Sequence, residues 1–102
     1  MNIKNLIAIS LVVSLVPSLS YAFKVQNDGS YTIKQIKISN KKAHWVVCKG
    51  LQGWGNTCQF TEGNVGDSMK ITIESNGTVI MKTLKDKKLT CKGAIPNISC
   101  SH

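Results

Sequence analysis

The chain has 102 residues and a net charge of +8, from 13 basic residues against five acidic ones. Every basic residue is lysine, and arginine is absent. Arginine is the side chain suited to bidentate recognition of phosphates and base edges, so this composition argues against specific nucleic-acid readout. The positive charge is expected to keep the protein soluble and to attract anionic surfaces weakly.

The first 22 residues have the layout of a secretory signal peptide. Lys4 supplies a positive start, residues 6–16 form an apolar run broken only by serines, and Pro17 ends the run. Small residues in the tripeptide 20–22 suit a cleavage site before Phe23. The run is too short to span a bilayer, which takes about 20 apolar residues. We therefore predict a cleaved signal peptide and a secreted or periplasmic protein.

Residues 23–102 would then form a single domain with a net charge of +7. A domain this small is marginally stable without covalent links, which Cys48, Cys58, Cys91 and Cys100 can provide in an exported chain. Four cysteines allow three pairings, and the local spacing favours Cys48–Cys58 and Cys91–Cys100 because each closes a short loop. Structural zinc sites usually space paired ligands about two to four residues apart, so these longer gaps argue against zinc. No cofactor is expected.

Apolar and polar residues alternate in short segments separated by turn-forming clusters, and no segment shows helical periodicity. In chain order, strands are predicted over residues 23–26, 31–39, 43–48, 58–61, 68–74, 78–84 and 89–91. Residues 93–96 are interpreted as a loop, and Cys100 as the anchor of the tail. This pattern predicts an all-β fold, namely a small disulfide-stapled antiparallel β-sandwich or barrel of about six to seven short strands.

The second predicted strand contains a break in its alternation. Tyr31 and Ile33 share one parity, whereas Ile36 and Ile38 share the other. A two-residue period cannot place all four on one face without an extra residue. We therefore predict a β-bulge near residues 34–35.

The clearest structural prediction is a hairpin over residues 68–84. Met69, Ile71 and Ile73 should face the core, with polar residues between them facing solvent. The dipeptide 76–77 is Asn-Gly, the preferred sequence of a two-residue hairpin turn.

The candidate binding region is the glycine-rich loop between Cys48 and Cys58. Trp54 lies there between two glycines, with Leu51 and Lys49 nearby. Trp54 could fold back over the disulfide as a small core, or it could project as a binding platform. Trp45, which is beside valines on a predicted strand, is interpreted as a core residue.

A second candidate is a lysine-rich segment close to the C-terminus. Its five lysines lie within eleven residues and are offset only by Asp86; they are Lys82, Lys85, Lys87, Lys88 and Lys92. They could form a charged edge that prevents strand-to-strand aggregation, or a patch for an anionic partner.

No catalytic motif accompanies these features. The sequence has neither a Gly-x-Ser-x-Gly elbow nor a His-Glu-x-x-His motif, and residues 23–102 contain only two histidines, His44 and His102. We therefore expect a non-enzymatic binding module that contacts an anionic polymer or surface, a glycan, a membrane surface or an extracellular protein. The alternative is a membrane-active, antimicrobial or toxin-like polypeptide that uses its charge with exposed Trp54 and Leu51.

Overall fold

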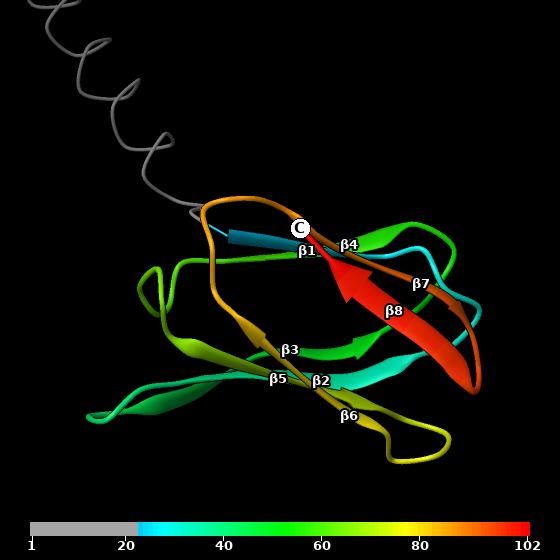
Figure 1. Ribbon diagram of the computed structural model, residues 1–102, viewed down its shortest axis with the longest axis horizontal. Coiled ribbons are helices and arrows are strands. Elements are labelled where there is room, and N and C mark those ends of the chain that lie inside the picture. The colour runs from blue at the N-terminus through cyan, green and yellow to red at the C-terminus, as the bar shows by residue number, and fades with distance from the viewer. Residues whose placement is uncertain (1–22) are drawn as a thin grey trace, which may run out of the picture.

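The computed structural model describes residues 23–102, which form two four-stranded β-sheets packed face to face (Figure 1). The strands are β1 (Phe23–Asn27), β2 (Ile33–Ser39), β3 (His44–Leu51), β4 (Asn56–Phe60), β5 (Ser68–Ile73), β6 (Val79–Thr83), β7 (Leu89–Ala94) and β8 (Asn97–Ser101). Sheet A has the strand order β4-β1-β7-β8, and sheet B has the order β3-β2-β5-β6. The all-β sandwich is confirmed. The predicted signal peptide lies outside the described residues.

Two details of the strand count and pairing differ from the prediction. An eighth strand, β8, follows a tight turn after β7 and pairs with it, where only an anchored tail was expected. All neighbouring strands are antiparallel except β1 and β7, whose register of Val25 with Leu89 is parallel. The parallel pair arises because β7 enters sheet A from sheet B and is inserted beside the first strand of the chain.

The core lies between the sheets and is built from alternating residues of both. The bulge predicted near residues 34–35 is confirmed, because the register between β2 and β5 shifts between Ile33 and Gln35. This shift lets Ile33, Ile36 and Ile38 all be fully buried on one strand, while Lys34 stays exposed.

The hairpin of β5 and β6 is confirmed, but its turn is longer than predicted. Met69, Ile71 and Ile73 are buried as expected. The Ile73 N–H donates to the Thr78 carbonyl at 2.8 Å, and the Gly77 N–H donates to the Ile73 carbonyl at 3.1 Å. The loop therefore has four residues, and Gly77 occupies its left-handed closing position at φ 69°. Asn-Gly sequences suit this position as well as a two-residue turn.

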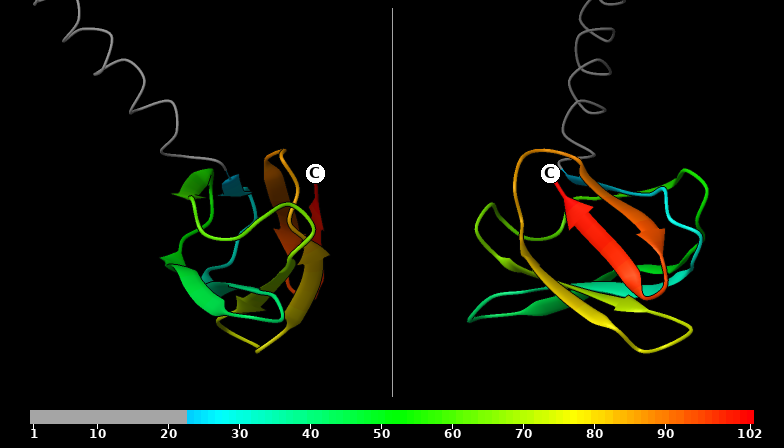
Figure 2. Two further views of the ribbon diagram at one scale, coloured as in Figure 1. Left: turned by 90° about the vertical axis from the view of Figure 1, so that its left-hand side faces the viewer. Right: turned by 45° about the vertical axis from the view of Figure 1, so that its right-hand side comes forward.

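The connections divide between two ends of the sandwich (Figures 1 and 2). At the end that we call the loop end lie residues 28–32, 52–55, 74–78 and 95–96. At the opposite end, which we call the terminal end, lie residues 40–43, 61–67 and 84–88, together with the start of β1. The candidate loop with Trp54 belongs to the loop end.

Candidate functional site

Both predicted disulfides are present. Cys48 on β3 is bonded to Cys58 on β4, which joins sheet B to sheet A at one edge of the sandwich. Cys91 and Cys100 are direct cross-strand neighbours on β7 and β8, so their bond lies within sheet A. No cysteine in residues 23–102 is free. The first bond closes the loop that carries Trp54, and the second lies near the same end.

Trp54 projects into solvent. Its side chain is 83% exposed, so it does not fold back over the Cys48–Cys58 bond. Its backbone φ is 64°, and within residues 23–102 it is the only residue other than glycine with positive φ. A bulky residue in this region is sterically strained, and such strain persists only where the surrounding structure imposes it.

Backbone hydrogen bonds hold the Trp54 loop against residues 27–29. The Trp54 N–H donates to the Gly29 carbonyl at 3.1 Å, and the next N–H, that of Gly55, donates to the Asn27 carbonyl at 2.8 Å. Gly53 packs so closely against the Gly29 carbonyl that a side chain at this position would collide with it. The loop is therefore fixed along its length rather than only at its disulfide.

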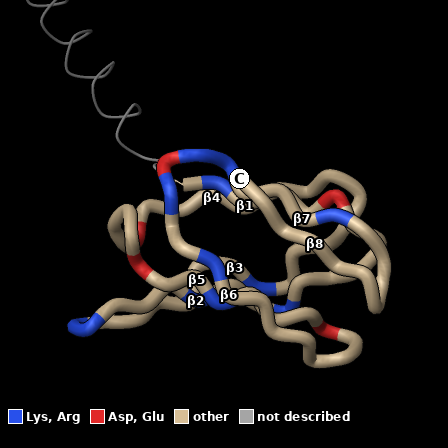
Figure 3. The backbone as a smooth tube through the Cα atoms, viewed as in Figure 1, with Lys and Arg blue, Asp and Glu red and all other residues tan. Residues whose placement is uncertain are grey.

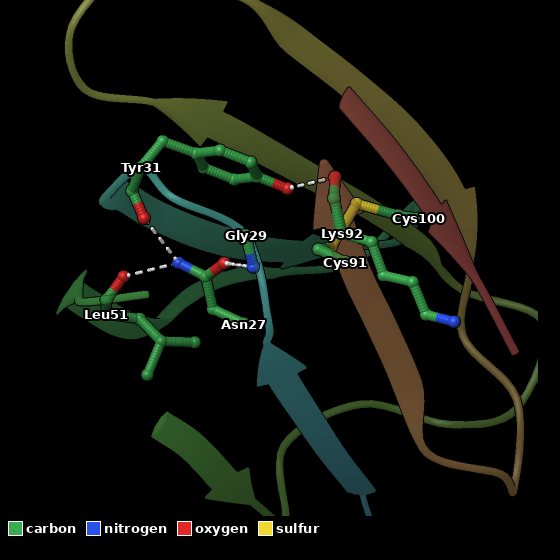
Figure 4. Close-up of a disulfide and its surroundings, with 7 residues drawn as sticks. All are labelled: Asn27, Gly29, Tyr31, Leu51, Cys91, Lys92 and Cys100. Carbon is green, nitrogen blue, oxygen red and sulfur yellow. Dashed lines mark hydrogen bonds between the residues drawn. A yellow bond between two sulfur atoms is a disulfide. The ribbon is translucent and has the colours of Figure 1, made fainter. Parts of the chain in front are cut away.

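The residue that organises this end is Asn27, which is completely buried. Its Nδ2 donates to the carbonyl of Tyr31 at 2.8 Å and to that of Leu51 at 3.0 Å, and its Oδ1 accepts the Gly29 N–H at 3.0 Å (Figure 4). One side chain thus ties together β1, the connection that leads into β2 and the end of β3. The strand predicted over residues 23–26 stopped one residue short of Asn27. Its position in the alternation could have identified it, because Asn27 lies on the same face of the strand as the buried Phe23 and Val25.

Tyr31 connects the same network to β7. Its hydroxyl donates to the Lys92 carbonyl at 3.0 Å beside the Cys91–Cys100 bond, and its ring covers Gly29 (Figure 4). Burial raises the pKa of the Tyr31 phenol above its ordinary value of 10.0. The phenol therefore remains a hydrogen-bond donor throughout the physiological range.

Leu51 does not belong to an exposed site. It is only 8% exposed, which corrects the hypothesis that it joins Trp54 at the surface. The reason is its register, since Leu51 lies opposite the fully buried Ile33 and so faces the core. Lys49 is exposed, as a surface contact requires. Trp45 is half-buried and packs against the core cluster, as its interpretation as a core residue requires.

The fold divides the lysine-rich segment, and basic positions are seen both along the β6–β7 connection and on β7 (Figure 3). The segment therefore does not form one patch with Trp54. Lys85, Lys87 and Lys88 lie in the β6–β7 connection at the terminal end, whereas Lys92 lies on β7 near the loop end. Lys88 is held by a hydrogen bond of 2.9 Å to the Gln26 side chain. Lys82 is half-buried on the edge strand β6.

A histidine joins this lysine group at the terminal end. Partial burial lowers the pKa of His102, and the nearby charges of three lysines lower it further; these are Lys85, Lys82 and Lys87. The lysine charges at the terminal end therefore oppose protonation of His102.

The loop end also carries an open pocket of about 270 Å³. Its walls combine hydroxyl groups, one carboxylate and one apolar side chain, from Ser30, Tyr31, Thr32, Glu74, Ser75 and Ile95. Ligand pockets usually measure about 300–1,000 Å³ and are mostly enclosed, so this hollow is at most an accessory to a larger contact. Within residues 23–102, no three histidine, cysteine or acidic side chains are arranged to bind a metal.

Comparisons with known proteins give no relative for this chain. No protein-family model matches it, and no similar protein was found among curated sequences or among solved structures. In the part of the chain that the structure describes, no helix is long and apolar enough to cross a membrane.

Proposed function

We propose that the protein is an exported, non-enzymatic binding module that holds an extracellular glycan or protein partner through the Cys48–Cys58 loop. One observation carries the proposal. Trp54 is a large aromatic residue that remains 83% exposed at a left-handed backbone position.

The tryptophan side chain at position 54 contributes little to folding. A left-handed backbone costs an ordinary residue about 1–2 kcal/mol, and an exposed indole recovers little of this cost through burial. Glycine would fit the position without strain. Strained residues that surrounding structure holds in place are concentrated at binding and catalytic sites. Contact with a partner is the role that explains an exposed tryptophan at this position.

The support of the loop favours binding over disorder. Its backbone bonds to Gly29 and Asn27, together with the Cys48–Cys58 bond, fix the loop before any partner arrives. A pre-ordered loop loses less conformational entropy on binding. Tryptophan is also among the residues that most often dominate the binding energy of interfaces.

The groups around Trp54 suit a partner with a mixed apolar and polar surface. The exposed Asn56 and Thr57 follow it, and the Asp28 carboxylate lies close to Gly55. A flat aromatic ring beside amide, hydroxyl and carboxylate groups can stack on a sugar ring or a peptide side chain and bond its polar edge. The lysines of the β6–β7 connection are at the other end, so they attract an anionic partner over distance rather than touch it at this loop.

Export is supported by the predicted signal peptide and by the two disulfides, which are compatible with an extracellular or otherwise oxidising compartment. A binding role is favoured over catalysis because Trp54 has no paired nucleophile and base beside it. Within residues 23–102, no hydrogen bond joins either histidine to a carboxylate or a hydroxyl.

The test compares Trp54→Ala with Val65→Ala, which removes an exposed apolar side chain from the terminal end. Binding is measured on a glycan array and on a heparin column. We expect Trp54→Ala to weaken the strongest interaction about tenfold or more, as for a hot-spot residue, with a melting temperature within a few degrees of the parent. Val65→Ala should change neither quantity. Unchanged binding, or a melting temperature lower by ten degrees or more, would contradict the proposal.

Dye release from vesicles distinguishes this function from the membrane-active alternative. A binding module should leave anionic vesicles intact at concentrations that saturate its partner. Rapid release that is lost in Trp54→Ala would favour a membrane-permeabilising polypeptide.

A further inference from the structure

The register of sheet B gathers lysines that are scattered along the sequence onto its solvent-facing side. Lys37 on β2 lies directly opposite Lys70 on β5, and Lys49 on β3 lies opposite Gln35. Lys34 is exposed at the bulge of β2. Figure 3 shows several lysines along the lower layer, where sheet B lies. Lys34, Lys37 and Lys70 belong neither to the Trp54 loop nor to the lysine-rich segment 82–92, whereas Lys49 lies on β3 just inside the Cys48–Cys58 loop.

The pair of Lys37 and Lys70 is unfavourable for the isolated fold. Like charges that are directly opposite on neighbouring strands destabilise a sheet. Their row continues to Val46 on one side and Met81 on the other, so neither lysine has an acidic neighbour in it. A surface of opposite charge would relieve this repulsion.

Apolar side chains flank these lysines on the same face. Val46 is 44% exposed on the edge strand β3, while Val79 and Met81 are 47% and 57% exposed on the edge strand β6. A linear polyanion would give these side chains nothing to contact. A lipid interface accepts both groups, because apolar side chains enter the boundary of the acyl chains while lysines reach anionic headgroups.

The outer face of sheet A has a different composition. One complete row across its four strands consists of Thr57, Gln26, Thr90 and Ser101, all of which are uncharged, and the lysines of its strands, Lys24 and Lys92, lie in separate rows opposite Gln59 and Ser99. The two faces therefore offer an internal comparison within one small domain. Only the sheet B face combines a central pair of lysines with exposed apolar residues at both edges.

We propose that the outer face of sheet B docks on the surface of an anionic lipid bilayer. Docking through this face lays the sheet parallel to the membrane and leaves the loop end at its side, free to hold a partner. The inference does not rest on the Trp54 site, because its central pair, Lys37 and Lys70, lies on β2 and β5, outside the Trp54 loop.

The experiment uses residues 23–102, which contain both sheets, the described core and both disulfides. Co-sedimentation is measured with vesicles containing roughly a quarter phosphatidylglycerol and with neutral phosphatidylcholine vesicles, at low salt. The test variant is Lys37→Gln with Lys70→Gln. The matched control is Lys85→Gln with Lys87→Gln, which removes the same charge from the β6–β7 connection.

We expect the parent protein to bind anionic vesicles only. Each lysine near an anionic membrane contributes roughly a fivefold change in partitioning, so the test variant, which lacks two, should bind about 25-fold more weakly. The control should change binding by less than about threefold. The melting temperature of the test variant should equal or exceed that of the parent, because it removes the like-charge pair.

A second variant separates a membrane from a polyanion. Met81→Ser should weaken vesicle binding several-fold and leave retention on heparin unchanged. The proposal would be overturned if the two lysine variants lost vesicle binding equally. It would also be overturned if Met81→Ser bound vesicles as well as the parent, and that result would assign the face to an anionic polymer. Trp54→Ala should leave vesicle binding unchanged, so failure of this inference and failure of the Trp54 site are distinguishable.

Discussion

The two ends of the sandwich each contain an asparagine whose side chain makes three hydrogen bonds, but in different surroundings. Asn27 at the loop end is completely buried and bonds only to backbone groups. Asn40 at the terminal end is exposed, accepts two backbone N–H groups and donates to Asp67. The buried residue fixes three segments around the Trp54 loop, whereas the exposed one shapes a surface turn. The loop end is therefore built to hold one geometry, which is what a binding site requires.

The largest expected effect is that of removing the buried asparagine. Asn27→Ala leaves two carbonyls and one N–H without partners in the interior, and each such group costs about 1–3 kcal/mol. We expect a loss of about 3–5 kcal/mol of unfolding free energy, measured by urea denaturation. Asn40→Ala is the matched control and should cost about 1 kcal/mol or less, since water replaces its lost bonds. Equal costs would mean that the two ends are not built differently.

The two disulfides should have equal effects on stability and unequal effects on binding. Their sequence separations are 10 and 9, so the chain-entropy model assigns about 3 kcal/mol to each. Replacing Cys48 and Cys58 by alanine should also weaken binding through the Trp54 loop. Replacing Cys91 and Cys100 should affect binding much less. Calorimetry measures the loss of stability, and the glycan array measures the loss of binding. Equal losses of binding in the two variants would show that the Cys48–Cys58 bond has no particular role in the binding site.

Glycine substitution at Trp54 should stabilise the fold. Trp54→Gly relieves a left-handed strain of about 1–2 kcal/mol, part of which is offset by the greater freedom of glycine in the unfolded chain. We expect a net gain of about 1 kcal/mol, or about 4–8 °C in melting temperature. Gly66 at the terminal end provides a control for the reverse substitution, because its φ is 100° and no atom would contact an added side-chain carbon. Gly66→Ala should destabilise by a similar amount, and a lower melting temperature for Trp54→Gly would indicate a structural role for the indole.

The smallest effect concerns the charge at the terminal end. Partial burial and neighbouring lysines lower the pKa of His102 in the folded protein below 6.5. The unfolded chain then binds more protons, so stability should decline as the pH falls through 6.5 and stop declining below the folded pKa. His102→Gln should remove this part of the decline. If the melting temperatures of the parent and the variant changed with pH in the same way, the lysines would not act on His102.

The fold class, the strand positions and both disulfide pairs could be predicted from the sequence because they depend on local patterns. Alternation revealed the strands, and the change of parity after Ile33 located the bulge. The β8 strand was missed because its five residues, Asn97–Ser101, contain a single aliphatic side chain, that of Ile98, and so looked like a tail after the predicted loop 93–96. The loop that ends at Gly77 was predicted to have two residues rather than four, because the Asn-Gly dipeptide suits both loop lengths.

The candidate site was less predictable because it depends on register between distant segments. Trp54 could be identified from its glycine neighbours, but its exposure could not, since both alternatives suited the same residues. Leu51 is buried by its pairing with Ile33, and the lysine-rich segment is divided because β7 crosses to the other sheet. The row of Lys37 and Lys70 similarly depends on the pairing of β2 with β5.

The most direct test of the account is the fluorescence of Trp54 in a Trp45→Phe variant, where it is the only tryptophan. Quenching is measured with iodide and with acrylamide, a neutral quencher that nearby lysines do not attract. The account predicts red-shifted emission, quenching by both agents close to that of free tryptophan, and protection when a ligand from the glycan array is bound. Blue-shifted emission that neither quencher reduces would show that Trp54 is packed against the protein and would contradict the binding site.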